Sequence, residues 1–153
     1  MTKTHIVIHH SLTKDSGTVS WGAIRHHHTK VNGWRKIGYH FGVELVGNFH
    51  EILVGRFSNE TGAHTREMGM NRIAIGICIV GNFDVDVPSE GILSRARNLV
   101  LWQMDEHEIP VQNVIGHRDA GLMTGFDWRK GEYKSCPGSQ FDMAAFRRSL
   151  LEV

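Results

Sequence analysis

The sequence is short of several features that mark particular protein classes. Its 153 residues include only two cysteines, too few for the disulfide framework that stabilises small secreted domains. Its apolar runs are shorter than the roughly 20 residues that a membrane-spanning helix requires. Lysine and arginine together outnumber the acidic residues by one, so the formal net charge is only +1. We therefore predict neither a membrane nor a nucleic acid as a partner.

Signals for export and for a second domain are also lacking. The N-terminal stretch MTKTHIVIHH has neither the apolar core nor the small-residue cleavage site of a secretory signal. We therefore expect synthesis in the cytoplasm without a signal peptide. The chain contains only three prolines and no low-complexity linker. Its length suits one domain with its own hydrophobic core, and we predict a single domain over residues 1–153.

Five segments have the pattern of β-strands. The clearest is RIAIGICIV, residues 72–80, whose continuous apolar run is typical of a central strand covered on both faces. THIVIH, residues 4–9, predicts a second buried strand, and NVIGH, residues 113–117, a shorter one. IGYHFGVEL and FHEILVGRF flank VGN, and together they predict a hairpin over residues 37–57.

Three segments are predicted to be helical. They are residues 19–30, capped by Thr18 or Ser20, a segment from Ser89 to before Pro110, and a segment from about Asp142. The second helix has one apolar stripe, made of Ile92, Leu93, Ala96, Leu99, Val100 and Met104. Residues 118–140 are expected to be irregular. Strands flanked by helices predict an α/β fold, a single domain with a central mixed β-sheet of about five strands and about three helices.

Histidine is plentiful, with 11 in the chain, and some of these residues stand at the ends of predicted elements. The pair His9 and His10 ends the first strand, His117 ends NVIGH, and Cys136 lies in the irregular segment. Zinc accepts imidazole and thiolate ligands together. Two histidines and one cysteine would leave a fourth position open, as in catalytic sites. Because neighbouring strand residues point to opposite faces, only one residue of the pair can readily reach the ion.

A lysine near the cysteine extends this hypothesis. Pro137 favours an extended conformation at Cys136, so Lys134 and Cys136 are expected to face the same side. A lysine beside a metal-bound thiolate can stabilise a developing oxyanion. The alternative is that Lys134 is an ordinary solvated surface lysine.

The order of several motifs points to a known family. The stretches are VIHHSLT, HHHTKVNGWRKIGYHFGVE, GAHTREMGMNRIAIGICIVGNF, IGHRDA and KSCPG. In this order, and over nearly the whole chain, the sequence resembles the zinc-dependent N-acetylmuramoyl-L-alanine amidases. That family includes short bacteriophage lysozyme-like amidases and the animal peptidoglycan recognition proteins.

The resemblance implies roles for individual residues. The ligands of Zn²⁺ would be His9, His117 and Cys136, and the catalytic residues would be Tyr39 and Lys134. The span between His117 and Cys136 is longer than in the shortest phage members. The inserted GLMTGFDWRKGEY contains Lys130, which competes for the lysine role. Lys134 is preferred because it precedes the cysteine by two residues, as in the family. Without the motif, Tyr39 would be interpreted as a core tyrosine.

Substrate-binding residues are less defined by the motifs. We predict this role for His64, Asn71 and Trp34. His64 matches a family position in the substrate cleft, but it can also be a loop histidine, and Asn71 can instead fix the turn before the strand at 72–80. Trp128 and Tyr133 of the inserted segment either line the cleft or pack the loop.

The implied activity is hydrolysis of the amide between the lactyl group of N-acetylmuramic acid and L-alanine in peptidoglycan. The chain would be a monomeric catalytic domain without a separate cell-wall-binding domain. It would act on the wall after release, as a phage or prophage endolysin does. Three alternatives stay open: a peptidoglycan-binding protein without catalysis, a regulator whose main partner is another protein, and a structural zinc domain with His10 or Asp119 as fourth ligand.

Overall fold

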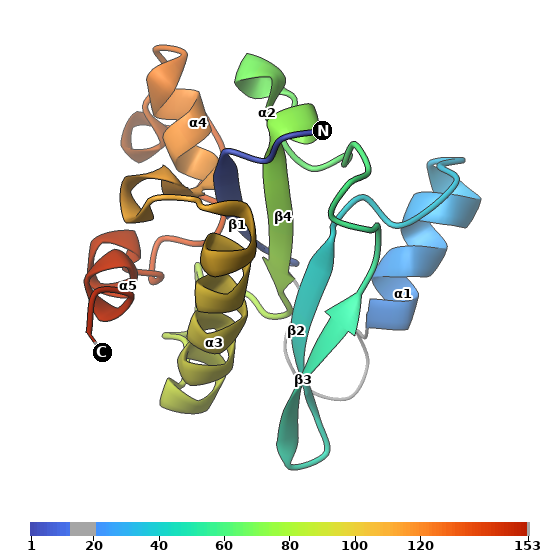
Figure 1. Cartoon of the computed structure of the whole chain (residues 1–153), viewed down its shortest axis with the longest axis horizontal. Helices are drawn as coiled ribbons and strands as arrows, with labels where there is room; N and C mark the ends of the chain where they lie inside the picture. The colour runs from blue at the N-terminus through green and yellow to red at the C-terminus, as the bar shows by residue number, and fades with distance from the viewer. Residues whose placement is uncertain (13–20, 153) are drawn as a thin grey trace.

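A five-stranded sheet lies at the centre of the computed structural model, which describes residues 1–12 and 21–152 (Figure 1). The strands are β1 (His5–His10), β2 (Phe41–Val46), β3 (Phe49–Val54), β4 (Ala74–Ile79) and β5 (Val114–Gly116). Their order across the sheet is β3-β2-β4-β1-β5. β2 and β3 form an antiparallel hairpin, and the other neighbouring pairs are parallel. The predicted mixed sheet, its hairpin and its central strand are confirmed.

Five α-helices lie in the described ranges. They are α1 (Trp21–His26), α2 (Met70–Ile73), α3 (Glu90–His107), α4 (His117–Met123) and α5 (Met143–Ser149). A π-helical turn, His27–Val31, continues α1. α3 packs on β2 and β3, and α5 packs on α3 and β5. α1 lies beside the β2–β3 hairpin, away from α3 and α5 (Figure 1).

The two faces of the sheet have different surroundings. Ile6 and Ile8 of β1 belong to the main core, together with Ile75, Ile77 and Ile79 of β4 and the buried side chains of α3 and α5. Val7 belongs to a second, smaller cluster with Met70, Ala74 and Ile115. Because side chains alternate along a strand, His9 lies on the face of Val7. On this face β4 presents the small residues Gly76 and Cys78, which leave room for other side chains.

Two of the helices were not predicted. α4 occupies the start of the segment that was expected to be irregular. Its first turn is stabilised by Asp119, whose Oδ2 accepts a hydrogen bond from the Gly116 main-chain N–H at 2.7 Å. The single turn of α2 covers residues 70–73, so β4 begins at Ala74 and not at residue 72. α2 is too short for a clear helical period in the sequence, and α4 begins after Gly116, which has no capping side chain to mark its start.

The three predicted helices are present as α1, α3 and α5. The Ser89 hydroxyl caps α3 by accepting from the Ile92 N–H at 3.2 Å, and the predicted stripe is buried at Ile92, Ala96, Leu99 and Val100. Asp142 caps α5 in the same way. The suggested caps of the first helix, Thr18 and Ser20, lie outside the described residues. Within residues 1–12 and 21–152, no helix combines the length and apolarity needed to cross a bilayer.

Candidate metal centre

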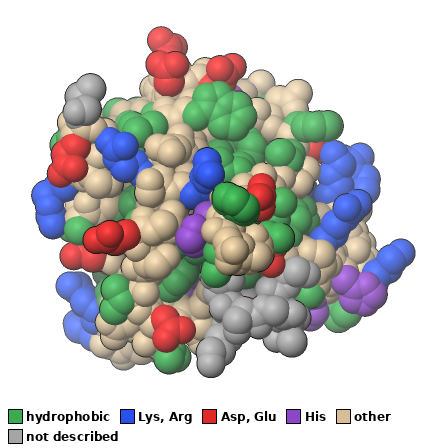
Figure 2. All heavy atoms as spheres, turned by 90° about the horizontal axis from the view of Figure 1, so that it is seen from below, with side chains coloured by type: hydrophobic (Ala, Val, Ile, Leu, Met, Phe, Trp, Pro, Cys, Tyr) green, Lys and Arg blue, Asp and Glu red, His purple; other side chains and the backbone are tan. Residues whose placement is uncertain are grey.

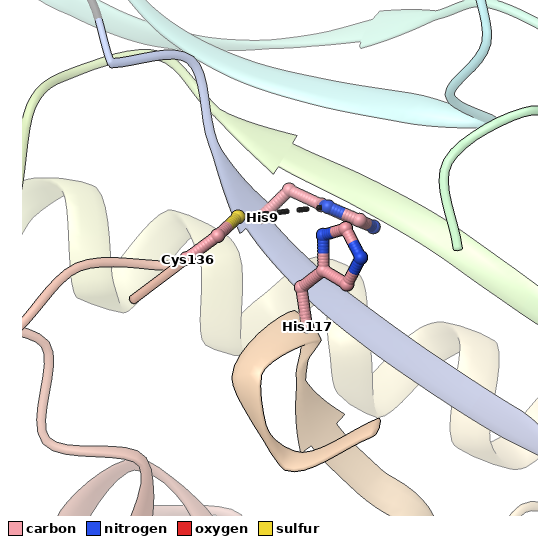
Figure 3. Close-up of side chains that lie close together, drawn as sticks. All are labelled: His9, His117 and Cys136. Atoms are coloured by element: carbon pink, nitrogen blue, oxygen red, sulfur yellow. Dashed lines mark hydrogen bonds between the residues drawn. The ribbon is translucent and has the colours of Figure 1, made fainter. Parts of the chain in front are cut away.

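Two adjacent parallel strands bring His9 and His117 together. In the register of β1 and β5, Ile8 pairs with Gly116, so the residues that follow this pair are His9 on β1 and His117, the first residue of α4. Both therefore lie at the same edge of the sheet, where parallel strands end. Cys136 joins them from the loop after α4. One donor atom from each of the three buried residues lies within 4.8 Å of the others, and Figure 3 shows the three side chains turned toward one another.

Main-chain contacts hold Cys136 in this position. Its Sγ accepts a hydrogen bond from the His10 N–H at 3.4 Å and lies 3.6 Å from His9 Nδ1. Its carbonyl accepts from the Arg118 N–H at 2.7 Å. The buried guanidinium of Arg118 also donates to the carbonyls of Gly138 and Phe141, so it anchors the loop that carries the thiol.

His10 points away from this group, as the alternation along β1 predicts. Its Nδ1 accepts a hydrogen bond from the Phe83 N–H at 3.1 Å, and its ring stacks on the Phe83 ring. The other suggested fourth ligand, Asp119, caps α4. Neither residue belongs to the group of potential donors found in the described part of the chain. A closed structural site with four protein ligands therefore lacks its two suggested candidates.

The protonation states of the two histidines fit a zinc site. Burial, and then the neighbouring His117 and His64 rings, hold the pKa of His9 well below its ordinary value. Burial lowers the pKa of His117 to about 4, with a further contribution from the positive charge of Lys134. Both imidazoles are thus neutral at neutral pH, which is the form that binds metal. Two neutral imidazoles, together with the thiolate that Cys136 forms when it loses its proton, are a donor set that zinc accepts.

His64 contacts the Nε2 atom of His9, and Asn71 holds the main chain of His64 in place. The Nε2 atom of His9 lies 3.0 Å from Nδ1 of His64 and 3.3 Å from the Thr65 hydroxyl. This leaves Nδ1 of His9 facing Cys136. Asn71 Oδ1 accepts from the main-chain N–H groups of His64 and Thr65, at 2.6 and 2.8 Å. These contacts correspond to the alternative role of Asn71, which is to fix the turn before the central strand.

The His64 ring also depends on a glycine. A Cβ atom on Gly76 would lie 2.5 Å from Cδ2 of His64. We expect Gly76→Ala to destabilise the fold by about 1–3 kcal/mol, because the ring is held by His9 and cannot move freely. Chemical denaturation measures this. Gly91→Ala is the matched control, since its Cβ would meet only the partly exposed His50 ring; equal losses in both variants would contradict the expectation.

Tyr39, Trp34 and Lys134 surround the opening above the three residues. A cavity there is lined by His9, His10, Ser11, Leu12, His28, Trp34, Tyr39, Ala63, His64, Asp84, His117, Lys134, Ser135 and Cys136. The Tyr39 ring lies 5.1 Å from the His9 ring, and burial raises its pKa well above the ordinary value, so the hydroxyl keeps its proton. The Trp34 ring packs on the His28 ring, and the two ring centroids are 4.7 Å apart. Lys134 lines this cavity, and Lys130 does not.

A second cavity extends this opening along the loop after β3. It shares Trp34, Ala63, His64, His117 and Lys134 with the first, and it adds Thr65, Arg66, Glu67, Asn71 and Tyr133. The two together form a cleft that leads away from the three candidate ligands. On the face shown in Figure 2, a histidine lies near the centre beside a basic side chain, with acidic and basic groups interspersed around it.

The family model for N-acetylmuramoyl-L-alanine amidase matches residues 1–139. The chain belongs to the N-acetylmuramoyl-L-alanine amidase family. The endolysin of Klebsiella phage KP32 is 29% identical over 140 residues, which cover 92% of this chain and 82% of the endolysin. Peptidoglycan-recognition protein LB of Drosophila melanogaster is 30% identical over 122 residues, 74% of this chain and 50% of that protein. The chain spans about half the length of several curated relatives that it matches.

Solved structures agree with this family membership. The endolysin amidase LysCS of Clostridium intestinale URNW superposes with a TM-score of 0.75 at 26% identity, over 98% of this chain and 84% of that one. Wild-type Drosophila PGRP-LB gives a TM-score of 0.68 at 25% identity, over 91% and 76% of the two chains. The amidase fold therefore extends over nearly the whole chain.

The structure adds Glu67 to the residues around this amidase-family site. Glu67 was not among the predicted residues, and its Oε2 lies 3.7 Å from Nε2 of His117. The sequence offered one sign of this role, because Glu67 is an acidic residue between His64 and Asn71, which were both predicted to bind substrate.

Two aromatic residues of the inserted segment, residues 121–133, have different roles. Tyr133 lines the cleft with its ring 5.7 Å from the His117 ring, whereas Trp128 packs under the guanidinium of Arg118.

Proposed function

We propose that the protein is a Zn²⁺-dependent amidase that hydrolyses the bond between the lactyl group of N-acetylmuramic acid and L-alanine in peptidoglycan. The observation that carries this proposal is the buried group of His9, His117 and Cys136 at the base of a cleft, with Tyr39 and Lys134 beside it. Family membership and the endolysins among the relatives support it. The proposed place of action is the cell wall.

The three donors would hold Zn²⁺ with one position open. When bound, zinc lowers the pKa of a water ligand from about 15.7 to near 7 and polarises a carbonyl oxygen. The Tyr39 hydroxyl keeps its proton and can donate a hydrogen bond to the attacking water or to the reacting carbonyl oxygen. Lys134 lines the same cavity as Cys136, and its ammonium can stabilise negative charge on that oxygen. Trp34 and His64 offer ring surfaces to the substrate.

The chain's residues favour this enzyme over a peptidoglycan-binding protein without catalysis. A binding protein has no need of a buried thiol beside two neutral imidazoles, or of a protonated phenol next to them. All of these groups are present and lie together. A monomeric state, and a further protein as partner, stay predictions from the sequence.

Zinc binding should release one proton, because only Cys136 must lose one. Burial raises the pKa of its thiol to about 12, whereas His117, with a pKa of about 4, and His9 are already neutral. Between pH 5.5 and 6.5 the zinc affinity should therefore rise about tenfold per pH unit. Calorimetry in buffers of different ionisation enthalpy counts the protons. Release of two protons in this range would mean that a histidine ligand is charged in the free protein.

Removal of the metal tests the proposed function itself. Purified peptidoglycan should lose turbidity with zinc-loaded protein and not with protein treated with a chelator, and added Zn²⁺ should restore the loss. Equal activity of the two samples would contradict a zinc-dependent reaction. Binding of the protein to the wall without any solubilisation would support the non-catalytic alternative.

A further inference from the structure

The carboxylate of Glu67 lies against the outer side of a candidate ligand. Its Oε2 is 3.7 Å from Nε2 of His117, and the side chains of the two residues are only 16% and 8% exposed. Oε2 is buried without a hydrogen-bond partner among the described residues. An unpartnered buried carboxylate oxygen is costly, and the Nε2 position of His117 is a donor site near it, beside the Tyr133 hydroxyl that faces the same carboxylate. A shift of a few tenths of an ångström would bring the two atoms within hydrogen-bond distance.

This contact would select one tautomer of the His117 ring. If Nε2 carries the proton and donates to Glu67, the lone pair of Nδ1 is free to face His9 and Cys136. His9 has the same arrangement, because its Nε2 is engaged by His64 and its Nδ1 faces Cys136. Figure 3 shows the His117 ring edge-on to His9. In metal sites, a carboxylate on the second ring nitrogen of a histidine fixes both its tautomer and its orientation.

The backbone after Glu67 has an uncommon conformation. Met68 has φ 54° and ψ 24°, and the following Gly69 has φ 69°, so two successive residues are left-handed. This conformation costs free energy for a residue with a side chain such as Met68, whose side chain is 56% exposed and gains little from packing. The turn is held on both sides, by the Asn71 bonds to His64 and Thr65 and by the start of α2. The strained turn keeps Glu67 pointing inward, toward His117.

The inserted segment closes the other side of Glu67. The Tyr133 ring packs so closely on α4 that a Cβ on Gly121 would lie 2.3 Å from its Cδ1. Its ring lies edge-on to that of His117 at 5.7 Å. Burial and the facing Glu67 carboxylate raise the pKa of Tyr133, so its hydroxyl keeps a proton that it can share with Glu67. The Glu67 side chain thus lies between the candidate ligand His117 and Tyr133, which lines the cleft.

We propose that Glu67 is a positioning residue, which orients the His117 ring and holds its Nε2–H tautomer so that Nδ1 is offered to the metal. This inference rests on the proposed function, since it assumes that His117 binds Zn²⁺. It assigns Glu67 no contact with substrate or with the reacting atoms. In this proposal the inserted segment also has a role, because its residue Tyr133 covers the Glu67 carboxylate.

Zinc affinity, measured by competition with a chromophoric chelator, tests the proposal without any activity assay. We expect Glu67→Ala to lower the affinity about 10–100-fold. Glu67→Gln should lower the zinc affinity less than Glu67→Ala does, because the amide oxygen of glutamine still accepts a hydrogen bond. The matched control is Glu106→Gln, which removes the same charge from an exposed position on α3 and should leave the affinity unchanged.

A second measurement separates positioning from a purely structural role. In metal-free protein, ¹⁵N NMR of the histidine rings should show the Nε2–H tautomer for His117 in the wild type and a mixture in Glu67→Ala. If the wild type binds one zinc and Glu67→Ala binds it as tightly, the role of Glu67 is refuted while the proposed function stands. If the wild type binds no zinc, the proposed function fails. A wild-type Nδ1–H tautomer would overturn the role of Glu67 in either case.

Discussion

Cys136→Ser should abolish zinc binding at micromolar metal and, with it, the hydrolysis of peptidoglycan. Serine has nearly the shape of cysteine, but its hydroxyl does not supply the soft anionic ligand that zinc prefers. If each ligand contributes a quarter of the roughly 10–16 kcal/mol of a four-ligand site, about 3 kcal/mol is lost, or more than 10²-fold in affinity. The measurements are zinc content after dialysis and the solubilisation of walls. The metal-free melting temperature should change little, because the thiol makes only two weak contacts, with the His10 N–H at 3.4 Å and with His9 Nδ1 at 3.6 Å.

The other cysteine provides a matched control for this substitution. Cys78 is also fully buried, on β4 beside His9 in the register of the sheet, but it is not part of the donor group. Cys78→Ala should therefore retain one zinc per chain. Zinc should also raise the melting temperature of the wild type and of Cys78→Ala but not that of Cys136→Ser. Full zinc occupancy in Cys136→Ser would show that the metal lies elsewhere.

Tyr39→Phe and Lys134→Ala should each lower kcat by about 10²-fold or more while one zinc stays bound. The phenol and the ammonium are proposed to act on the reacting oxygens, and neither belongs to the donor group. Initial rates on purified walls, together with zinc content, measure the two effects separately. Loss of zinc in Tyr39→Phe would instead assign the tyrosine a role in building the site.

The inserted segment offers the control for the lysine. Lys130 competes with Lys134 on sequence grounds, but only Lys134 lines the cavity above the candidate ligands. Lys130→Ala should therefore keep wild-type rates. If Lys130→Ala is impaired and Lys134→Ala is not, the assignment based on the two-residue offset from Cys136 is wrong.

Local patterns were sufficient to predict most of the sheet. The alternation of side chains along β1 separated His9 from His10 before any contact was known, and the structure places the two rings on opposite sides. The same patterns failed for two short helices. α2 was absorbed into the predicted strand, because four residues contain too little of the helical period. α4 was absorbed into a segment expected to be irregular, because its N-cap is a glycine, whereas α5, of the same length, is marked by its Asp142 cap.

The surroundings of the site were harder to predict than its candidate ligands. Cys136 reaches His9 across 127 positions, and the spacing alone did not indicate this; only the resemblance to a family did. Glu67 escaped notice because its position depends on a left-handed Met68, a conformation that the residue type does not favour. Asn71 lines the cleft, where its predicted contact with substrate stays a prediction, and its oxygen also accepts two main-chain hydrogen bonds. Such roles depend on backbone geometry that a single sequence does not display.

Identification of the bond that is cleaved is the decisive test of the proposed amidase reaction. Purified peptidoglycan is digested with zinc-loaded wild type and, in parallel, with Cys136→Ser, and the soluble products are analysed by mass spectrometry and end-group labelling. We expect new L-alanine amino termini, in equal number with free lactyl carboxyl groups on muramic acid, in the wild-type digest alone. New reducing sugar ends, or new amino termini on residues other than L-alanine, would contradict it.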